Sequence, residues 1–312
     1  MKNITLAYSS CPNDTFIFYA IAHKLLKIHK TGVTSKIKPD DIGTKNIVGY
    51  KDAINLTDNI EFKITIADVE TLNQHAANGF FDVTKLSFAT FGVLRDKYAL
   101  LRTGAAIGRG CGPLLISLPE RRMINYSKIA VPGTGTTAFV LFSLFLKENF
   151  PQVKPEFIPM PFEKIMRAVK DEIVDFGVII HEGRFIYKNL GLESFVDLGE
   201  WWESFTQLPI PLGCIAIKRS IYQNAPELAV RIQQMIGESI QYGFDHPESG
   251  RAYIKIHAQE LDDEVINQHI HLYVNNFSKN IGNEGEAAIR IFFQKAEDAG
   301  LIKPSTQPIF AC

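Results

Sequence analysis

The composition of the chain excludes several classes of partner. It has 312 residues, with 33 Lys or Arg against 34 Asp or Glu and a formal net charge of −1. This length fits one large domain or two lobes of ordinary size, so a sizeable buried core is expected. Because the charges balance, no basic field favours nucleic acid or an anionic membrane. We therefore expect a small-molecule partner bound at a local site, while the sequence carries no signal for an oligomeric state.

Apolar runs and cysteines bear on the cellular location. No stretch of 18 or more apolar residues predicts a transmembrane helix. Residues 1–7 lack an apolar segment of signal-peptide length. The four cysteines, at positions 11, 111, 214 and 312, stand singly and show no metal-ligand spacing. This pattern favours reduced thiols in a cytoplasmic protein, without a metal site, over a disulfide framework.

The first part of the chain alternates strand and helix patterns. Residues 4–8 alternate apolar and polar side chains, and an apolar helix pattern follows at 16–26. Residues 28–59 are polar and irregular and predict a surface insertion. A strand, a helix and a second strand are then predicted at 62–66, 69–77 and 82–87. This rhythm predicts an α/β fold.

A similar unit recurs in the middle of the chain. Strands are predicted at 128–131, 157–160 and 176–180, separated by helices at 136–147 and 162–169. In the second helix Phe162, Ile165, Met166 and Val169 recur at helical spacing and form one apolar face. The chain therefore contains two predicted βαβαβ halves, which match in topology and share little residue identity.

The rest of the chain completes a two-lobed prediction. Short apolar segments at 112–117 and 212–217, bracketed by Gly and Pro, predict crossings between the lobes, and helices are predicted from residue 225 to residue 299. We expect lobe 1 to comprise residues 1–117 and 208–312, and lobe 2 residues 118–207. Each lobe would hold a central sheet flanked by helices. Ligands of such sheets bind beyond the carboxyl ends of the strands, here in the cleft between lobes.

Two strand-end segments could bind an oxygen-rich ligand. The turn at residues 9–15 leads into a helix, so Asn13 could bind a ligand oxygen, or Asn13 and Asp14 could only cap that helix. The segment GTGTTA at 133–138 places Thr137 and Ala138 at a helix start, where unpaired N–H groups suit a carboxylate or a phosphate. A plain Thr-capped helix is the alternative, and no Walker lysine follows.

Two further segments follow predicted strands. Lys85, Leu86 and Ser87 end the strand at 82–87, where a snorkelling lysine and a surface serine are the structural alternative. The stretch GVIIHEGRF places His181 directly after a buried apolar run. A histidine there can take and return a proton near neutral pH, and without a nucleophile elbow base catalysis is favoured over a covalent relay. Arg184 is open between a substrate contact and a structural pair with Glu182.

Several motifs together resemble one family. SSCPNDTFIFYA, DVTKLSF, GRGCGPLL, VPGTGTTAF, VIIHEGRF, DLGEWWE and HAQELDDEVINQHIHLYVNNFS are similar to segments of the MqnD family of 1,4-dihydroxy-6-naphthoate synthases. The resemblance runs through nearly the whole chain except residues 28–59. It implies a fold similar to type II periplasmic binding proteins and a cofactor-free lyase reaction in the futalosine route to menaquinone. The implied substrate is cyclic dehypoxanthinyl futalosine.

The resemblance also implies roles for individual residues. His181, in the family motif IIHE, would be the proton acceptor. The substrate-binding segments would be KLS and TTA, which contain Lys85, Leu86, Ser87, Thr137 and Ala138. One rival from another class is a non-catalytic solute-binding protein for a small carboxylate, because one scaffold can host many functions.

Overall fold

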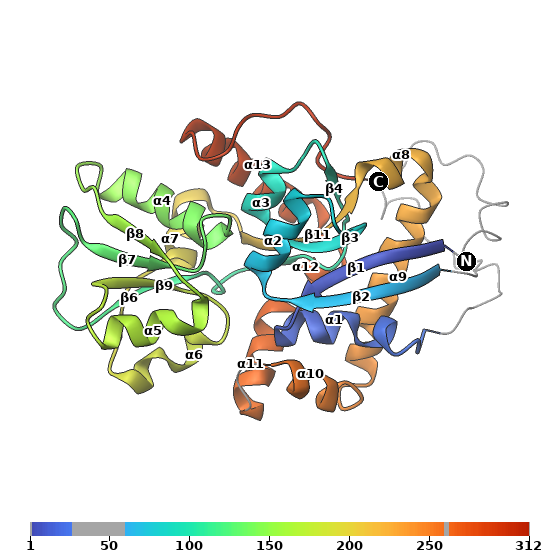
Figure 1. Ribbon diagram of the computed structural model, residues 1–312, viewed down its shortest axis with the longest axis horizontal. Coiled ribbons are helices and arrows are strands. Elements are labelled where there is room, and N and C mark those ends of the chain that lie inside the picture. The colour runs from blue at the N-terminus through green and yellow to red at the C-terminus, as the bar shows by residue number, and fades with distance from the viewer. Residues whose placement is uncertain (1, 27–59, 259–261, 312) are drawn as a thin grey trace.

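The protein consists of two lobes lying side by side (Figure 1). This computed structural model describes residues 2–26, 60–258 and 262–311, so the predicted insertion at 28–59 lies outside the described residues. Each lobe is built on one β-sheet with helices packed against it. The prediction of an α/β fold with a sheet in each lobe is confirmed. Within the described residues no helix is both long and apolar enough to cross a membrane.

The sheet of lobe 1 has the strand order β2-β1-β3-β11-β4, and β5 also pairs with β11. Strand β1 is parallel to β2 and β3, as a βαβ rhythm requires, whereas β11 is antiparallel to β3, β4 and β5. The strands are β1 Lys2–Ser9, β2 Ile60–Ala67, β3 Val83–Ser87, β4 Tyr98–Leu100, β5 Ala106–Gly108 and β11 Ile210–Lys218.

Helices from both ends of the chain cover the lobe 1 sheet. Helix α1 (Pro12–Ala22) is buried on almost every face because α9, α10 and α11 all pack against it. The side chain of Asp68 caps α2 by accepting hydrogen bonds from the N–H groups of Glu70 and Thr71. The remaining helices of this lobe are α2 Val69–Ala77, α3 Phe88–Val93, α8 Arg219–Asn224, α9 Pro226–Asp245, α10 Arg251–His257, α11 Asp263–Tyr273, α12 Asn276–Lys279 and α13 Gly282–Asp298.

Lobe 2 has the strand order β10-β6-β9-β7-β8. Its three parallel strands β7, β8 and β9 form the predicted second βαβαβ unit, and β6 and β10 add antiparallel pairs. Apolar clusters fill both faces of the sheet, one beneath α4 and one beneath α5. The elements are β6 Leu114–Ser117, β7 Lys128–Val131, α4 Thr137–Asn149, β8 Glu156–Pro159, α5 Phe162–Lys170, β9 Phe176–Ile179, α6 Gly183–Ile186, a 3-10 turn Tyr187–Leu190, β10 Glu193–Asp197 and α7 Leu198–Thr206.

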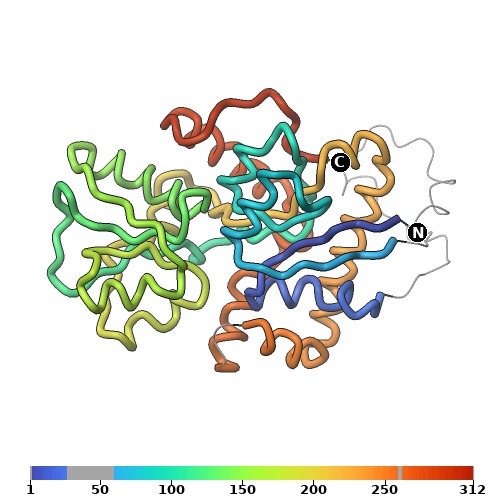
Figure 2. Tube along the Cα trace, viewed as in Figure 1, coloured from blue at the N-terminus to red at the C-terminus, as the bar shows by residue number. Residues whose placement is uncertain are grey.

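The chain passes between the lobes twice (Figure 2). The passages are the short segments between β5 and β6 and between α7 and β11. The apolar runs that predicted these crossings are themselves sheet strands: β6 belongs to the lobe 2 sheet and β11 to the lobe 1 sheet. The boundary predicted at residue 117 therefore differs from the observed sheets by one strand. The pattern of a short apolar run bounded by Gly and Pro is the same for a linker and for a buried strand, so the sequence does not distinguish them.

An apolar contact joins the lobes on one side. Trp202 of α7 is fully buried, and its ring packs 6.0 Å from that of Phe292 on α13, while its indole N–H donates to the carbonyl of Pro209. Residues of α4 belong to the same core cluster. Trp202 is therefore a residue of the apolar core. The lobes are therefore held together by apolar packing of α4 and α7 against α13.

Candidate active site

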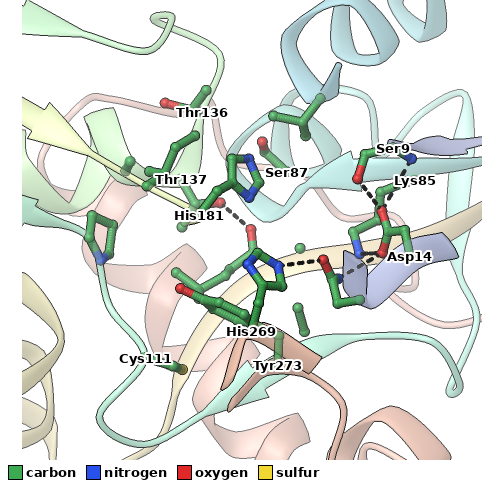
Figure 3. Close-up of a pocket in the computed structure, with 18 residues that line it drawn as sticks. Ser9, Asp14, Lys85, Ser87, Cys111, Thr136, Thr137, His181, His269 and Tyr273 are labelled. Carbon is green, nitrogen blue, oxygen red and sulfur yellow. Dashed lines mark hydrogen bonds and ion pairs between the residues drawn. The ribbon is translucent and has the colours of Figure 1, made fainter. Parts of the chain in front are cut away.

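A cavity of about 80 Å³ lies between the two lobes (Figure 3). Strand ends of both sheets contribute to its wall, as the topology predicted. The predicted site residues that line it are Asn13, Lys85, Ser87, Thr137, Ala138 and His181. Further lining residues include Ser9, Asp14, Cys111, Thr136, His269 and Tyr273. The structure thus brings together four predicted segments that are distant in the sequence.

Two predicted site residues do not line this cavity. Leu86 is fully buried within the lobe 1 core, because its side chain points to the opposite face of β3 from those of Lys85 and Ser87. Arg184 donates to the carbonyl oxygen of Gly112 at 2.7 Å and pairs with Asp197 at 2.6 Å. Of the two alternatives for Arg184, the contacts fit a structural pair, and the ion-pair partner is Asp197 where the sequence offered Glu182.

His181 follows the last residues of β9 in an unusual backbone conformation. Its φ is 55°, in the left-handed region that a residue with a Cβ rarely adopts. Such strain persists where the surrounding structure imposes it, often at functional sites. Burial lowers the pKa of His181 from 6.5 to about 4, against an opposing effect of Asp14. The imidazole is therefore neutral at physiological pH and able to accept a proton.

Cys11 of lobe 1 contacts His181 of lobe 2. The Sγ atom lies 3.4 Å from Nδ1 and 3.8 Å from Nε2 of the imidazole. Sequence reasoning expected no cysteine beside this histidine, because 170 residues separate the two positions. Burial raises the pKa of the Cys11 thiol well above its usual value, and the carboxylates of Glu182 and Asp14 add to this effect. Cys11 is therefore a neutral thiol and a hydrogen-bonding partner of His181.

A buried carboxylate in the cavity wall, that of Asp14, binds several neighbouring side chains. Asp14 is completely buried and pairs with Lys85, with 2.5 Å between Oδ1 and Nζ. The hydroxyl of Ser9 donates to Oδ2 at 2.7 Å, and the Asn13 amide donates to Oδ1 at 2.9 Å. Lys85 is thus an ion-paired residue of the site, not the snorkelling lysine of the structural alternative. The buried charge of Asp14 is stabilised by this partner and these hydrogen bonds.

Asn13 and Asp14 do not cap helix α1. The N-cap is Cys11, which makes no side-chain capping bond. Instead the Oδ1 atom of Asn13 lies 3.0 Å from Nε2 of His269. His269 comes from α11, and its ring lies parallel to that of His181 with 6.1 Å between centroids. Sequence reasoning missed His269, because a histidine in a helical tail gives no signal that the helix returns to the cleft.

Ser87 is held by a network from helix α2. The side chain of Asn73 accepts from the Ser87 N–H at 3.0 Å and donates to the Ser87 hydroxyl at 3.2 Å. The same amide lies 3.1 Å from the carboxylate of Glu70. Asn73 is almost fully buried, so these contacts fix the end of β3 relative to α2. Asn73 is a positioning residue for which the sequence predicted no role.

The start of helix α4 forms the lobe 2 side of the cavity. Thr136 is the N-cap, and its hydroxyl accepts a hydrogen bond from the Phe139 N–H. Thr137 and Ala138 occupy the next two positions, where backbone N–H groups have no partner within a helix. The Thr136 cap therefore leaves the N–H groups of Thr137 and Ala138 available for a carboxylate or a phosphate, so the two interpretations of this segment do not exclude each other. The positive end of the α4 dipole faces the cavity.

Hydrogen bonds across the cleft hold the lobes closed. Thr90 donates to the carbonyl of Gly135 at 2.8 Å, and the Thr137 hydroxyl donates to the carbonyl of Leu212 at 2.7 Å. Gly133 has a φ of 129°, and a Cβ there would lie 2.6 Å from Glu70 Cδ. Only glycine fits this closed contact without strain. The cavity of about 80 Å³ is smaller than the about 300–1,000 Å³ that binding sites for ligands of drug size span.

Family membership follows from comparison with known proteins. Residues 4–298 match a family described as "Menaquinone biosynthesis". This chain belongs to that menaquinone biosynthesis family. A 1,4-dihydroxy-6-naphthoate synthase of Thermus thermophilus is 38% identical over 310 residues, covering 99% of this chain and all of the relative. One from Streptomyces coelicolor is 39% identical over 299 residues, covering 96% and 94% of the two chains.

Solved structures place the family within a wider fold group. A protein from Archaeoglobus fulgidus has a TM-score of 0.79 and 31% identity, covering 96% of this chain and 98% of its own. The periplasmic aliphatic sulphonate-binding protein of Escherichia coli has a TM-score of 0.62 at 11% identity, covering 97% and 89%. At that identity the likeness shows the fold alone. The predicted periplasmic-binding-protein-like fold is confirmed.

Proposed function

We propose that this protein is a 1,4-dihydroxy-6-naphthoate synthase that acts on cyclic dehypoxanthinyl futalosine. Two full-length relatives with that synthase name support the product. Family membership supports a place in menaquinone biosynthesis. The main support for a catalytic role comes from His181. Its neutral imidazole lines the cavity between the lobes, and its backbone has a strained conformation. Cytoplasmic location and independence from a cofactor stay predictions.

His181 is the general base of this proposal. The Cys11 sulfur lies 3.4 Å from Nδ1 of this imidazole, and in the proposed reaction a lone pair of the neutral ring accepts a proton from the substrate. Loss of this proton allows a carbon–carbon bond to break, and the sugar-derived fragment leaves as the product ring becomes aromatic. A positioned base contributes about 10²- to 10⁴-fold to the rate. The burial that keeps His181 neutral also removes competing water once the lobes close.

The remaining cavity residues bind the substrate. The N–H groups at the start of α4, at Thr137 and Ala138, suit its carboxylate. Ser87, held by Asn73, offers a hydroxyl from the opposite lobe. Because one ligand then contacts both lobes, binding stabilises the closed state. The predicted substrate contacts Lys85 and Asn13 act through the cluster around Asp14 in this proposal, and Leu86 acts only in core packing.

The decisive experiment incubates the purified protein with cyclic dehypoxanthinyl futalosine and follows the naphthoate product by its absorbance. We expect product with the wild type and a loss of about 10²- to 10⁴-fold with His181→Ala. Undiminished turnover by His181→Ala would sink the assignment of the base. Tight binding without product from the wild type would favour the solute-binding alternative instead.

A further inference from the structure

One polar atom in the cavity wall lacks a hydrogen-bond partner. Among the described residues, Nδ1 of His269 makes no hydrogen bond although the side chain is completely buried. An unsatisfied buried polar group costs free energy, and native proteins contain few of them. His269 also lines the cavity, beside Tyr273 and below His181 (Figure 3). We therefore expect a ligand atom to form a hydrogen bond with Nδ1 of His269.

The neighbouring hydrogen bonds fix which nitrogen of His269 carries the proton. Asp14 is an acceptor, so the Asn13 amide turns its NH₂ group toward Asp14 and its oxygen toward His269. That oxygen can only accept, and it lies 3.0 Å from Nε2. Nε2 must therefore carry the hydrogen. In a neutral imidazole the other nitrogen, Nδ1, is then an acceptor.

The charge state of His269 agrees with this tautomer. Burial lowers the pKa of His269 well below its usual value, and the nearby His181 and Lys85 lower it further. The ring is therefore neutral whenever the protein is folded near neutral pH.

The other acceptor near His269, the carboxylate of Asp14, is already occupied. Its Oδ1 atom binds Lys85 and Asn13, and its Oδ2 atom binds the backbone N–H and the hydroxyl of Ser9. Asp14 therefore cannot serve as the acceptor for a ligand.

We propose that His269 binds substrate by accepting a hydrogen bond at Nδ1 from a substrate hydroxyl group. This inference rests on the proposed function and adds a specificity-determining residue to it. Because His181 and His269 line the same cavity, with 6.1 Å between their ring centroids, the hydroxyl bound at Nδ1 belongs to the same substrate molecule that His181 deprotonates. His269 would thus select a hydroxylated substrate over an analogue that lacks the hydroxyl, because the analogue leaves Nδ1 unpaired.

Two substitutions separate this role from a purely structural one. His269→Gln keeps a donor at the position of Nε2, which can still bond to Asn13, but lacks an acceptor at the position of Nδ1. His269→Asn keeps an oxygen near the position of Nδ1 but loses the bond to Asn13. His271→Gln is the matched control, because His271 lies on the same helix and is exposed.

The first readout is kcat/KM for cyclic dehypoxanthinyl futalosine. We expect His269→Gln to lose about 10- to 100-fold in kcat/KM, His269→Asn to lose less, and His271→Gln to match the wild type. A role limited to holding Asn13 predicts the reverse order of the two His269 variants. That order would overturn the proposal, provided that circular dichroism shows both variants folded.

The second readout is the ¹⁵N NMR spectrum of His269 in the protein without substrate. We expect a protonated Nε2 and an unprotonated Nδ1, whose resonance moves when substrate binds. A protonated Nδ1 would overturn the proposal without reference to activity. The two proposals also fail differently. A wild type that makes no naphthoate refutes the function, whereas an active wild type with an equally active His269→Gln variant refutes the role of His269.

Discussion

Acidification should destabilise the protein through His181. In the folded protein burial lowers the pKa of His181 to about 4, while in the unfolded chain it titrates near 6.5. Above about pH 6.5 both states are neutral, so this residue adds no pH dependence. Between about pH 6.5 and 4 the unfolded state binds one more proton, and the free energy of unfolding falls by about 1.4 kcal/mol per pH unit. The full effect reaches up to about 3 kcal/mol near pH 4.

His181→Asn isolates this effect. Asparagine has no titratable group and tolerates the left-handed conformation at this position. Urea unfolding followed by circular dichroism would be measured at about pH 7 and about pH 5 for the wild type and the variant. We expect the wild type to lose about 2 kcal/mol more than His181→Asn between these pH values. The exposed His271→Asn should behave like the wild type.

The comparison is made between variants because other groups titrate in the same range. His269 has a lowered pKa and steepens the fall in both proteins, and carboxylates begin to protonate near pH 5. These contributions cancel in the difference between wild type and His181→Asn, apart from their coupling to His181. Parallel stability curves for the two proteins would refute the burial of a neutral His181.

Three further outcomes follow from the same geometry. The acid limb of kcat/KM should lie near pH 4 rather than near 6.5, because His181 stays neutral as the pH falls to about 4; a limb near 6.5 would show an ordinary histidine pKa. Arg184→Met should lower the free energy of unfolding, measured in urea, by about 1–3 kcal/mol, because it leaves Asp197 without its ion-pair partner. KM should stay unchanged, and a large rise in KM would show that Arg184 contacts the substrate. Gly133→Ala should raise KM by pressing on Glu70 in the closed cleft, and an unchanged KM would show that this contact does not govern closure.

Local sequence patterns determined most of the secondary structure. The strand and helix rhythm predicted β1, β3 and α2 at nearly their observed bounds, and it predicted both βαβαβ units. The apolar patterns of these segments sufficed because strands and helices repeat their side chains with different periods. The same rhythm places polar residues at strand ends, which is why the sequence could indicate His181 and the start of α4 as parts of one cleft.

Pairings between distant segments were decided only by the tertiary structure. Nothing local distinguishes the strand β6 from a linker, or shows that Arg184 meets Asp197 rather than Glu182. The chain must fold before α11 brings His269 to Asn13, across 256 positions, and before closure brings Cys11 to His181. Such contacts depend on the packing of lobes and helices. The sequence therefore determined the elements and the chemistry at their ends, and the tertiary structure decided which side chains share the cavity.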